Sequence, residues 1–264
     1  MSAINGATRL YGIVGHPIVQ VKSPELYGRL FVAAGMNAVM IPLHVLPEQF
    51  DQAIAALMGV ENVDGLIVTV PYKARAVAFA TRLGPTASRI RALNALRREP
   101  DGSWTGDMFD GAGFVRAAQI QGQPLRGRKV ALFGAGGAGS AIACELLAAG
   151  VASIAIMDVR SERANALARA LREAFPACRV EPAAQVPADA DMIVNASTVG
   201  MLESDGMPGE LGALRRDTLV GDVVISEAPT AIIRHALQHG CAHVTGRDML
   251  AGQSDALMSF FTRA

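Results

Sequence analysis

The 264-residue chain has few cysteines and no excess of either charge. Its three cysteines, Cys144, Cys178 and Cys241, lie far apart and form no C-x-x-C pair, which argues against a disulfide framework, a thiol metal site and a redox motif. A reducing cytoplasm fits this usage best. The 24 Lys and Arg balance 24 Asp and Glu, so no charge footprint for nucleic acid or an anionic membrane is present. We therefore expect a small-molecule partner.

Long apolar runs are also missing. No run reaches the roughly 20 residues that span a bilayer, and the first residues lack the basic segment and apolar core of a signal peptide. We expect a cytoplasmic protein. Among the five histidines, His235 and His239 have helical spacing but no H-E-x-x-H pattern, so a solvated helix face is favoured over a zinc site. We expect no metal.

The most informative segment that is present lies between residues 130 and 158. An apolar run with strand character leads into a G-x-G-x-x-G turn, an apolar helical run and a second strand that ends in an acid. Such a turn lets backbone N–H groups approach a pyrophosphate at a helix N-terminus. We expect a dinucleotide to bind here, at Gly134, Ala135, Gly136, Gly137, Ala138, Gly139 and Asp158.

Asp158 indicates which dinucleotide is preferred. A carboxylate at this strand end accepts hydrogen bonds from the ribose hydroxyls and repels a 2′-phosphate, which favours NAD over NADP. Arg160 and Arg163 follow closely, and an arginine there can pair with a 2′-phosphate. NADP therefore remains the alternative cofactor.

The pattern of elements predicts an α/β protein with two domains. In the first part we expect strands at 10–14, 38–43 and 65–70 in a smaller parallel sheet, helices at 24–34 and 47–58, and a hairpin through 100–103. In the second we expect a helix at 111–121, strands at 179–181, 192–195 and 219–224 with helices between them, and a last helix at 249–262.

The domain boundary is expected near residue 110. Residues 1–110, rejoined by 248–264, form an N-terminal α/β substrate-binding and catalytic domain, and residues 111–247 form a Rossmann-type doubly wound NAD(P)-binding domain, with a cleft between the two. Ligands bind at the carboxyl ends of parallel strands, which places residues 195–201 and 226–228 beside the cofactor.

Several motifs, in the same order along almost the whole chain, resemble those of the shikimate/quinate dehydrogenase family. Residues 15–24 are similar to its G-x-P-I-x-x-S-x-S-P, 68–73 to V-T-x-P-x-K, 106–111 to G-x-N-T-D-G, 195–201 to N-A-T-x-x-G-M and 249–253 to M-L-x-x-Q, and Asn94 stands in its A-x-N-T segment. The resemblance implies reversible oxidation of a ring alcohol, in a shikimate- or quinate-like cyclic hydroxy-carboxylate, with NAD or NADP.

Hydride transfer from a secondary alcohol requires a group within hydrogen-bond reach that removes the hydroxyl proton. The resemblance implies that Lys73 and Asp110 form this catalytic pair, with Lys73 as the proton shuttle and Asp110 as its partner on the substrate hydroxyl. Most lysines and aspartates are solvated surface charges. The hypothesis therefore depends on both residues standing at matching motif positions.

The resemblance also implies polar residues that bind the substrate. Ser23 contacts its carboxylate, and the same residue is suited to cap the helix that begins at Pro24. Asn94 offers a donor and an acceptor to a ring hydroxyl, or else stabilises a turn. Thr69 and Gln253 are the remaining polar matches. The cofactor side is completed by Arg160, Asn195, Ala196, Ser197, Gly246 and Met249.

Four positions depart from the family pattern. Val21 replaces the first of two carboxylate-binding serines, Ile67 an Asn, Phe109 a Thr and Ile225 a Tyr. Each change removes a hydrogen-bonding group, and an unpaired buried hydroxyl costs roughly 1–3 kcal/mol. We therefore expect a less hydroxylated substrate or a different pose of its carboxylate.

Two alternatives stay open on the sequence. A catalytically silent nucleotide-binding or regulatory paralogue would explain the altered pocket, although Lys73, Asn94, Asp110 and Gln253 are retained. A dehydrogenase of the methylene-tetrahydrofolate type is the nearest enzyme alternative, but the N-terminal motifs do not favour it. Either a monomer or a homodimer is compatible with the sequence.

Overall fold

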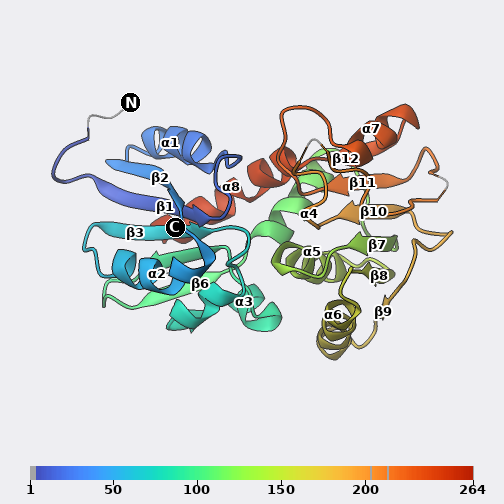
Figure 1. Cartoon of the computed structure of the whole chain (residues 1–264), viewed down its shortest axis with the longest axis horizontal. Coiled ribbons are helices and arrows are strands. Elements are labelled where there is room, and N and C mark those ends of the chain that lie inside the picture. Colours follow the sequence, from blue (N-terminus) through green and yellow to red (C-terminus); the bar gives the residue numbers. More distant parts are fainter. Residues whose placement is uncertain (1–3, 203, 213, 264) are drawn as a thin grey trace. The chain divides into compact units, whose positions relative to one another are not determined.

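A computed structural model describes residues 4–202, 204–212 and 214–263 (Figure 1). The chain divides into two compact units. Unit 1 comprises the chain up to Phe109 together with the residues from Ser254 onward, and unit 2 comprises Asp110–Gln253. The last helix, α8 (Gly246–Thr262), therefore begins in unit 2 and ends in unit 1.

Unit 1 is built on a six-stranded sheet in the order β2-β1-β3-β5-β6-β4. Its strands are β1 (Arg9–Gly15), β2 (Ala38–His44), β3 (Val63–Val68), β4 (Arg82–Leu83), β5 (Ala95–Arg98) and β6 (Trp104–Asp107). Its helices are α1 (Ser23–Ala33), α2 (Phe50–Met58), α3 (Pro85–Ile90) and the 3-10 turns η1 (Pro47–Gln49) and η2 (Arg75–Phe79). The three strands and the helices expected up to residue 70 are all present.

The three strands expected up to residue 70 pair in parallel, as predicted, but the sheet also contains antiparallel pairs and, with six strands, is not smaller than that of unit 2. β1 pairs in parallel with β2 and β3, but β5 pairs antiparallel with both β3 and β6. β5 and β6 are antiparallel because the turn that joins them after Arg98 is tight. It is closed by a 2.8 Å hydrogen bond that Glu99 N donates to Ser103 O. So short a connection joins only antiparallel strands, as the expected hairpin requires.

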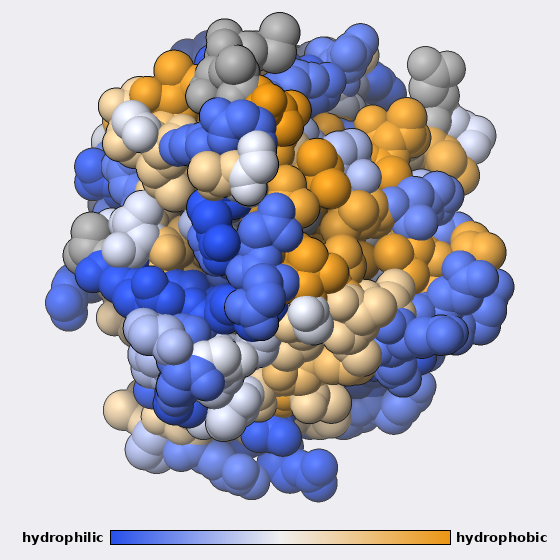
Figure 2. Space-filling view, turned by 90° about the vertical axis from the view of Figure 1, so that its left-hand side faces the viewer, coloured by the Kyte–Doolittle hydropathy of each residue, from blue (hydrophilic) through white to orange (hydrophobic). Residues whose placement is uncertain are grey.

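Helices α1 and α2 cover opposite faces of the unit 1 sheet (Figure 1). On the α1 face, the ring of Tyr11 lies 4.7 Å from that of Phe31 and 5.0 Å from that of Phe261, which α8 supplies. A Cβ on Gly65 would come within 2.7 Å of Phe261, so glycine there lets the C-terminal helix approach the sheet. On the surface, Figure 2 shows an apolar area beside a hydrophilic strip; the exposed apolar residues of unit 1 include Val32 and Ile41.

Unit 2 is a parallel, doubly wound sheet in the order β12-β11-β10-β7-β8-β9, as the sequence predicts. Its strands are β7 (Lys129–Phe133), β8 (Ser153–Met157), β9 (Arg179–Pro182), β10 (Met192–Asn195), β11 (Leu219–Asp222) and β12 (Ala242–Val244). Its helices are α4 (Asp110–Ile120), α5 (Gly137–Ala148), α6 (Ser161–Ala174), α7 (Ala231–Gln238) and the start of α8.

Two of the helices expected between these strands do not form. In the described residues, the connections from β9 to β10 and from β10 to β11 contain turns and bends only. Prolines and glycines explain this, because Pro187, Gly200, Pro208 and Gly209 interrupt the two segments. The strand order reverses between β7 and β10, and such a switch point is where ligands bind in this architecture. Among the described residues, no helix is long and apolar enough to span a bilayer.

Candidate active site

In unit 1, the loop after β1 and the end of β3 are joined at the carboxyl edge of the sheet. Thr69 N donates to Val14 O and His16 N donates to Val70 O, both at 2.9 Å. A Cβ on Gly15 would overlap Thr69 Cγ2, so only glycine permits this contact. The motifs at 15–24 and 68–73, which are far apart in the sequence, therefore meet in the fold.

Lys73 and Asn94 belong to the same hydrogen-bonded segment of unit 1. Leu93 N donates to Lys73 O at 2.9 Å, and Asn94 N donates to Asp107 O at 3.1 Å. Asn94 is buried, and its Oδ1 accepts a 2.9 Å hydrogen bond from Phe109 N. The amide oxygen of Asn94 thus stabilises the connection between β6 and α4, which is one of the two roles that the sequence allows. Phe109 directly precedes Asp110, so the backbone of Lys73 is linked through Leu93 and Asn94 to the start of the segment that carries the acid.

Ser23 is buried and is the first residue of α1. The sequence predicted it as the N-cap, but Lys22 takes that position and no side chain caps the helix. The prediction fails because Ser23 already has helical conformation, from which its hydroxyl does not reach the N–H groups of the next turn. The capping role is therefore absent, and substrate contact remains the prediction for this hydroxyl.

Three of the four apolar replacements lie in one apolar cluster. Ile67 is buried with Tyr11 and Phe31, and Val21 and Phe109 pack against the same group of side chains. The ring of Phe109 lies 5.2 Å from that of Phe260. The three departures from the family pattern in unit 1 therefore occur together in one place, because Val21, Ile67 and Phe109 belong to the same apolar cluster.

In unit 2, the glycine turn has the geometry that a dinucleotide requires. Gly134 has φ +97°, and a Cβ on Gly139 would overlap Gly134 O, so neither position accepts a side chain. Above Gly136, at the N-cap of α5, a Cβ would meet no atom within 4 Å. Ala135, Gly137 and Ala138 reach the surface beside it. Open space at a helix N-terminus fits a pyrophosphate.

Asp158 faces this turn from the end of β8. Its Oδ2 accepts a 2.7 Å hydrogen bond from Ala135 N, and its Oδ1 accepts one of 2.9 Å from Arg160 N. The carboxylate is thereby held against the glycine turn, while the Arg160 side chain is exposed. Each carboxylate oxygen can accept a further bond, so the residue fits the ribose role.

The loop after β10 is organised by Asn195, which is fully buried. Its Nδ2 donates to Val199 O at 2.9 Å, and its Oδ1 accepts from Ser197 Oγ at 2.6 Å and Ser197 N at 3.1 Å. The side chain therefore holds its own loop, a structural role that the sequence did not indicate, and its contact with the cofactor stays a prediction. Ala196 and Ser197 lie beside the glycine turn, as predicted from the sequence, because a Cβ on Gly134 would lie 2.7 Å from Ala196 O and 2.8 Å from Ser197 N.

The remaining site residues of unit 2 lie on α4, on the start of α8 and after β11. Asp110 is the first residue of α4 and is buried. A Cβ on Gly113, one turn later, would lie 2.5 Å from Met249 O and 2.8 Å from Gln253 Cβ, so α8 crosses α4 at this point. Gly246 likewise lets α8 begin against the end of β11, since its Cβ would overlap Val223 O and Val224 O. Ile225 follows β11 and is half-buried.

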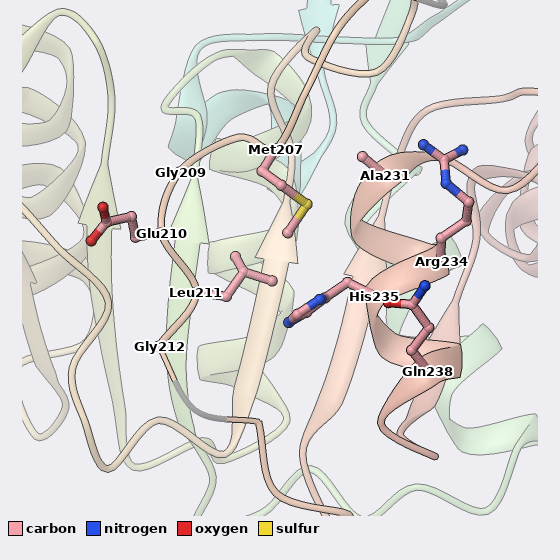
Figure 3. Close-up of a pocket in the computed structure, with 9 residues that line it drawn as sticks. All are labelled: Met207, Gly209, Glu210, Leu211, Gly212, Ala231, Arg234, His235 and Gln238. Carbon is pink, nitrogen blue, oxygen red and sulfur yellow. The ribbon is translucent and has the colours of Figure 1, made fainter.

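A pocket of about 650 Å³ lies elsewhere on unit 2 (Figure 3). It is lined by Met207, Gly209, Glu210, Leu211, Gly212, Ala231, Arg234, His235 and Gln238. None of these is a predicted site residue. The described residues contain no group of three or more His, Cys, Asp or Glu arranged to hold a metal ion.

Sequence reasoning missed one polar residue that contacts the loop after β10. Asp222, at the end of β11, is buried, and burial raises the pKa of its carboxyl against hydrogen bonds from Thr230, Val224 and Asn195 that lower it. The signal was present as a single acid that ends an otherwise apolar strand beside the loop at 195–201.

The chain matches known families along most of its length. Residues 13–96 match the family described as "Shikimate dehydrogenase substrate binding domain", and residues 116–202 match "Shikimate / quinate 5-dehydrogenase". The shikimate dehydrogenase (NADP(+)) of Rubrobacter xylanophilus is 36% identical over 95% of this chain and 89% of that protein.

Solved structures give the same result. The shikimate 5-dehydrogenase of Listeria monocytogenes, in complex with shikimate and NAD, superposes with a TM-score of 0.86 at 25% identity and covers 100% of this chain and 95% of its own. The 5-ketofructose reductase of Gluconobacter sp. strain CHM43 superposes with a TM-score of 0.84 at 25% identity, covering 98% and 95%.

These relatives do not support a preference for NAD, because they include an enzyme named for NADP(+) as well as a complex with NAD. Neither a silent paralogue nor a folate-type enzyme is favoured by them. The chain belongs to the shikimate dehydrogenase family and is a shikimate dehydrogenase-like, nicotinamide-dinucleotide-dependent oxidoreductase that acts on a CH–OH group.

Proposed function

We propose that this protein transfers hydride between NAD and a ring carbon of a cyclic hydroxy-carboxylate that carries fewer hydroxyls than shikimate. Residues 1–110 with 248–264 supply the substrate and catalytic groups, and residues 111–247 hold the cofactor. The observation that carries the proposal is a set of hydrogen bonds in unit 1. Leu93 N donates to Lys73 O, and Phe109 N donates to Asn94 Oδ1. These bonds connect two predicted site residues to Phe109, which directly precedes Asp110 in the sequence.

The proposed chemistry assigns one task to each polar residue. Lys73 Nζ takes the single hydroxyl proton during oxidation and returns it during reduction, and the Asp110 carboxylate is its partner on that hydroxyl, where its negative charge offsets the positive charge that Lys73 gains with the proton. Asn94, Ser23, Thr69 and Gln253 orient the ring through its other polar groups. When bound, the dinucleotide supplies the hydride acceptor or donor. Apolar neighbours of the ring exclude water from the reacting carbon.

The cofactor preference rests on Asp158. Its carboxylate, held by Ala135 N and Arg160 N, is a fixed negative charge beside the glycine turn. A 2′-phosphate would approach this charge, whereas the two ribose hydroxyls of NAD would donate to it. Arg160 is exposed and is the residue that would oppose this preference.

The substrate preference rests on Val21, Ile67 and Phe109, which share the cluster in unit 1. A substrate hydroxyl against this cluster loses its hydrogen bonds to water without replacement. A ring that lacks the hydroxyl, or whose carboxylate binds in another pose, avoids the cost.

The reaction is tested by assaying Lys73→Met and Lys129→Met with NADH and NADPH. Lys129 is the control because its ammonium makes an exposed ion pair with Asp189 and it is not a predicted site residue. We expect Lys73→Met to lose turnover by at least about a thousandfold while its Kd for NADH stays unchanged, since the proton shuttle acts in the transition state. Equal loss of cofactor binding would contradict the role of Lys73.

The substrate is tested with shikimate, quinate, their deoxy analogues and simpler hydroxycyclohexane carboxylates, with both cofactors. Because one structural relative is called 5-ketofructose reductase, 5-ketofructose is included in the reductive direction. We expect a deoxy analogue to have the highest kcat/KM. Shikimate as the best substrate would overturn the altered specificity, and NADH binding without turnover of any compound would favour a silent paralogue.

A further inference from the structure

The buried carboxylate of Asp222 lies at the centre of a polar cluster in unit 2. It is 1% exposed, at the end of a strand otherwise made of Leu219, Val220 and Gly221. Its Oδ1 accepts hydrogen bonds of 3.0 Å from Asn195 Nδ2 and Val224 N, and its Oδ2 accepts one from Thr230 Oγ1. Burying a carboxylate costs free energy unless hydrogen bonds replace those lost to water. Breaking any of these three bonds would therefore leave a buried carboxylate oxygen with too few donors, which favours keeping the donors in place.

The carboxylate orders the loop after the neighbouring strand. Asn195 and Asp222 are register partners on β10 and β11, so the Asp222 carboxylate decides which way the Asn195 amide points. With Nδ2 directed to Asp222 Oδ1, the amide oxygen is left to accept from Ser197 N and Ser197 Oγ. Ser197 Oγ in turn accepts from Val199 N at 3.2 Å. Reversing the amide would break the bonds that Asn195 makes to Asp222 Oδ1, Val199 O and Ser197 together.

The ordered loop lies directly against the glycine turn. A Cβ on Gly134 would come within 2.8 Å of both Ala196 C and Ser197 N, and one on Gly139 would lie 3.5 Å from Ala196 Cβ. A continuous chain of contacts therefore runs from Asp222 through Asn195 to the backbone at 196–197 and on to Gly134. Close packing transmits a displacement along such a chain, because interiors have little free volume.

We propose that Asp222 is a positioning residue for the dinucleotide: it fixes the Asn195 amide and thereby the loop that supports the glycine turn. This inference rests on the proposed placement of the cofactor at that turn. We expect loss of the Asp222 carboxylate to weaken binding of the cofactor more than it slows the chemical step, since Asp222 is not one of the proposed catalytic groups. The charge itself is not required, because an Asn at this position keeps an oxygen for Asn195 and Val224 and offers an N–H to Thr230 Oγ1.

The test compares Asp222→Ala with Asp222→Asn by fluorescence titration of NADH and NADPH, alongside KM and kcat. For Asp222→Ala we expect Kd and cofactor KM to rise about tenfold, with kcat at saturating cofactor within about twofold. Asp222→Asn is expected to restore the affinity. Thr230→Val, which removes one of the three donors and is a milder change, is expected to raise Kd by about threefold.

The control for a merely structural effect is Thr218→Val. Thr218 is equally buried beside β11, and its hydroxyl accepts a 3.2 Å bond from Arg215 N, outside the cluster around Asp222. We expect it to lower Tm without changing Kd. If Asp222→Ala and Thr230→Val lower Tm and likewise leave Kd unchanged, the positioning role is overturned.

A second variant separates this outcome from a failure of the cofactor placement. Gly136→Asp adds a carboxylate where the structure has open space and an ordinary φ of −82°, so the fold tolerates it while the charge repels a pyrophosphate. Retained NADH binding in Gly136→Asp would contradict the placement of the dinucleotide. Loss of binding in Gly136→Asp with full binding in Asp222→Ala would contradict only the role of Asp222.

Discussion

Replacing Glu99 with Gln should destabilise unit 1 at neutral pH but much less in acid. Glu99 lies in the hairpin turn after β5, and its side chain is 10% exposed. Burial raises the pKa of its carboxyl, but hydrogen bonds from Thr105, Arg97 and Arg263 outweigh burial and lower it to about 2. Arg97 also donates to Phe260 O in α8, so the carboxylate holds the C-terminal helix through two arginines.

The magnitude follows from the difference between the two pKa values. A change from 4.5 in the unfolded chain to about 2 in the folded chain would correspond to roughly 3 kcal/mol at pH 7 if it were fully realised. Arg263 is 46% exposed, so solvent screens part of the interaction and we expect about 1–2 kcal/mol. Because the folded pKa is the lower one, this stability is present above pH 4.5 and is lost as the pH falls towards 2.

Urea unfolding at pH 7 and at pH 3 measures the effect. The chain has one tryptophan, and this residue, Trp104, is buried in unit 1, so its fluorescence reports the unit that Glu99 stabilises. The free energy of unfolding of Glu99→Gln should lie about 1–2 kcal/mol below that of the unmodified protein at pH 7, and the difference should shrink by more than half at pH 3.

Glu25→Gln is the matched control, because Glu25 is 70% exposed and pairs with Lys22 at 3.5 Å. Its effect should stay below about 0.5 kcal/mol at both pH values. A loss in Glu99→Gln that is equal at pH 3 and pH 7 would refute the reasoning, since it would show that shape and neutral hydrogen bonds, not charge, stabilise the turn.

Three further predictions concern the site and its surroundings. Asp158→Ala should weaken NAD more than NADP, because the change removes both the ribose acceptor and the repulsion of a 2′-phosphate; an unchanged ratio of the two Kd values would assign the choice to Arg160 or to the backbone. Val21→Ser combined with Ile67→Asn should raise kcat/KM for shikimate relative to its deoxy analogue by about tenfold, and steady-state kinetics showing no relative gain would place the two residues away from the substrate. Arg91→Gly should raise the free energy of unfolding by about 0.5–1 kcal/mol, because Arg91 has φ +55°, and urea titration showing a loss would mean that its side chain contributes more than its backbone costs.

Local patterns predicted most of the elements. The apolar runs at 130–133 and 192–195 became β7 and β10, and the glycine turn between β7 and α5 has the backbone that its spacing indicates. The hairpin through 100–103 was predicted and makes β5 and β6 antiparallel, but the pairing of β5 with β3 in one mixed sheet was not predicted, because alternation of strands and helices describes neighbours in sequence and not which strands pair.

The sequence by itself determined the fold class, the glycine turn with Asp158, and the motif positions of Lys73, Asn94 and Asp110, because these depend on local spacing and residue type. Tertiary structure decided the rest: that Asn94 Oδ1 accepts from Phe109 N, that Val21, Ile67 and Phe109 share one cluster, and that Asn195 is turned inward by Asp222. The physical reason is that a side-chain amide or a carboxylate has several possible partners, and only the packing of distant strands and loops selects one of them.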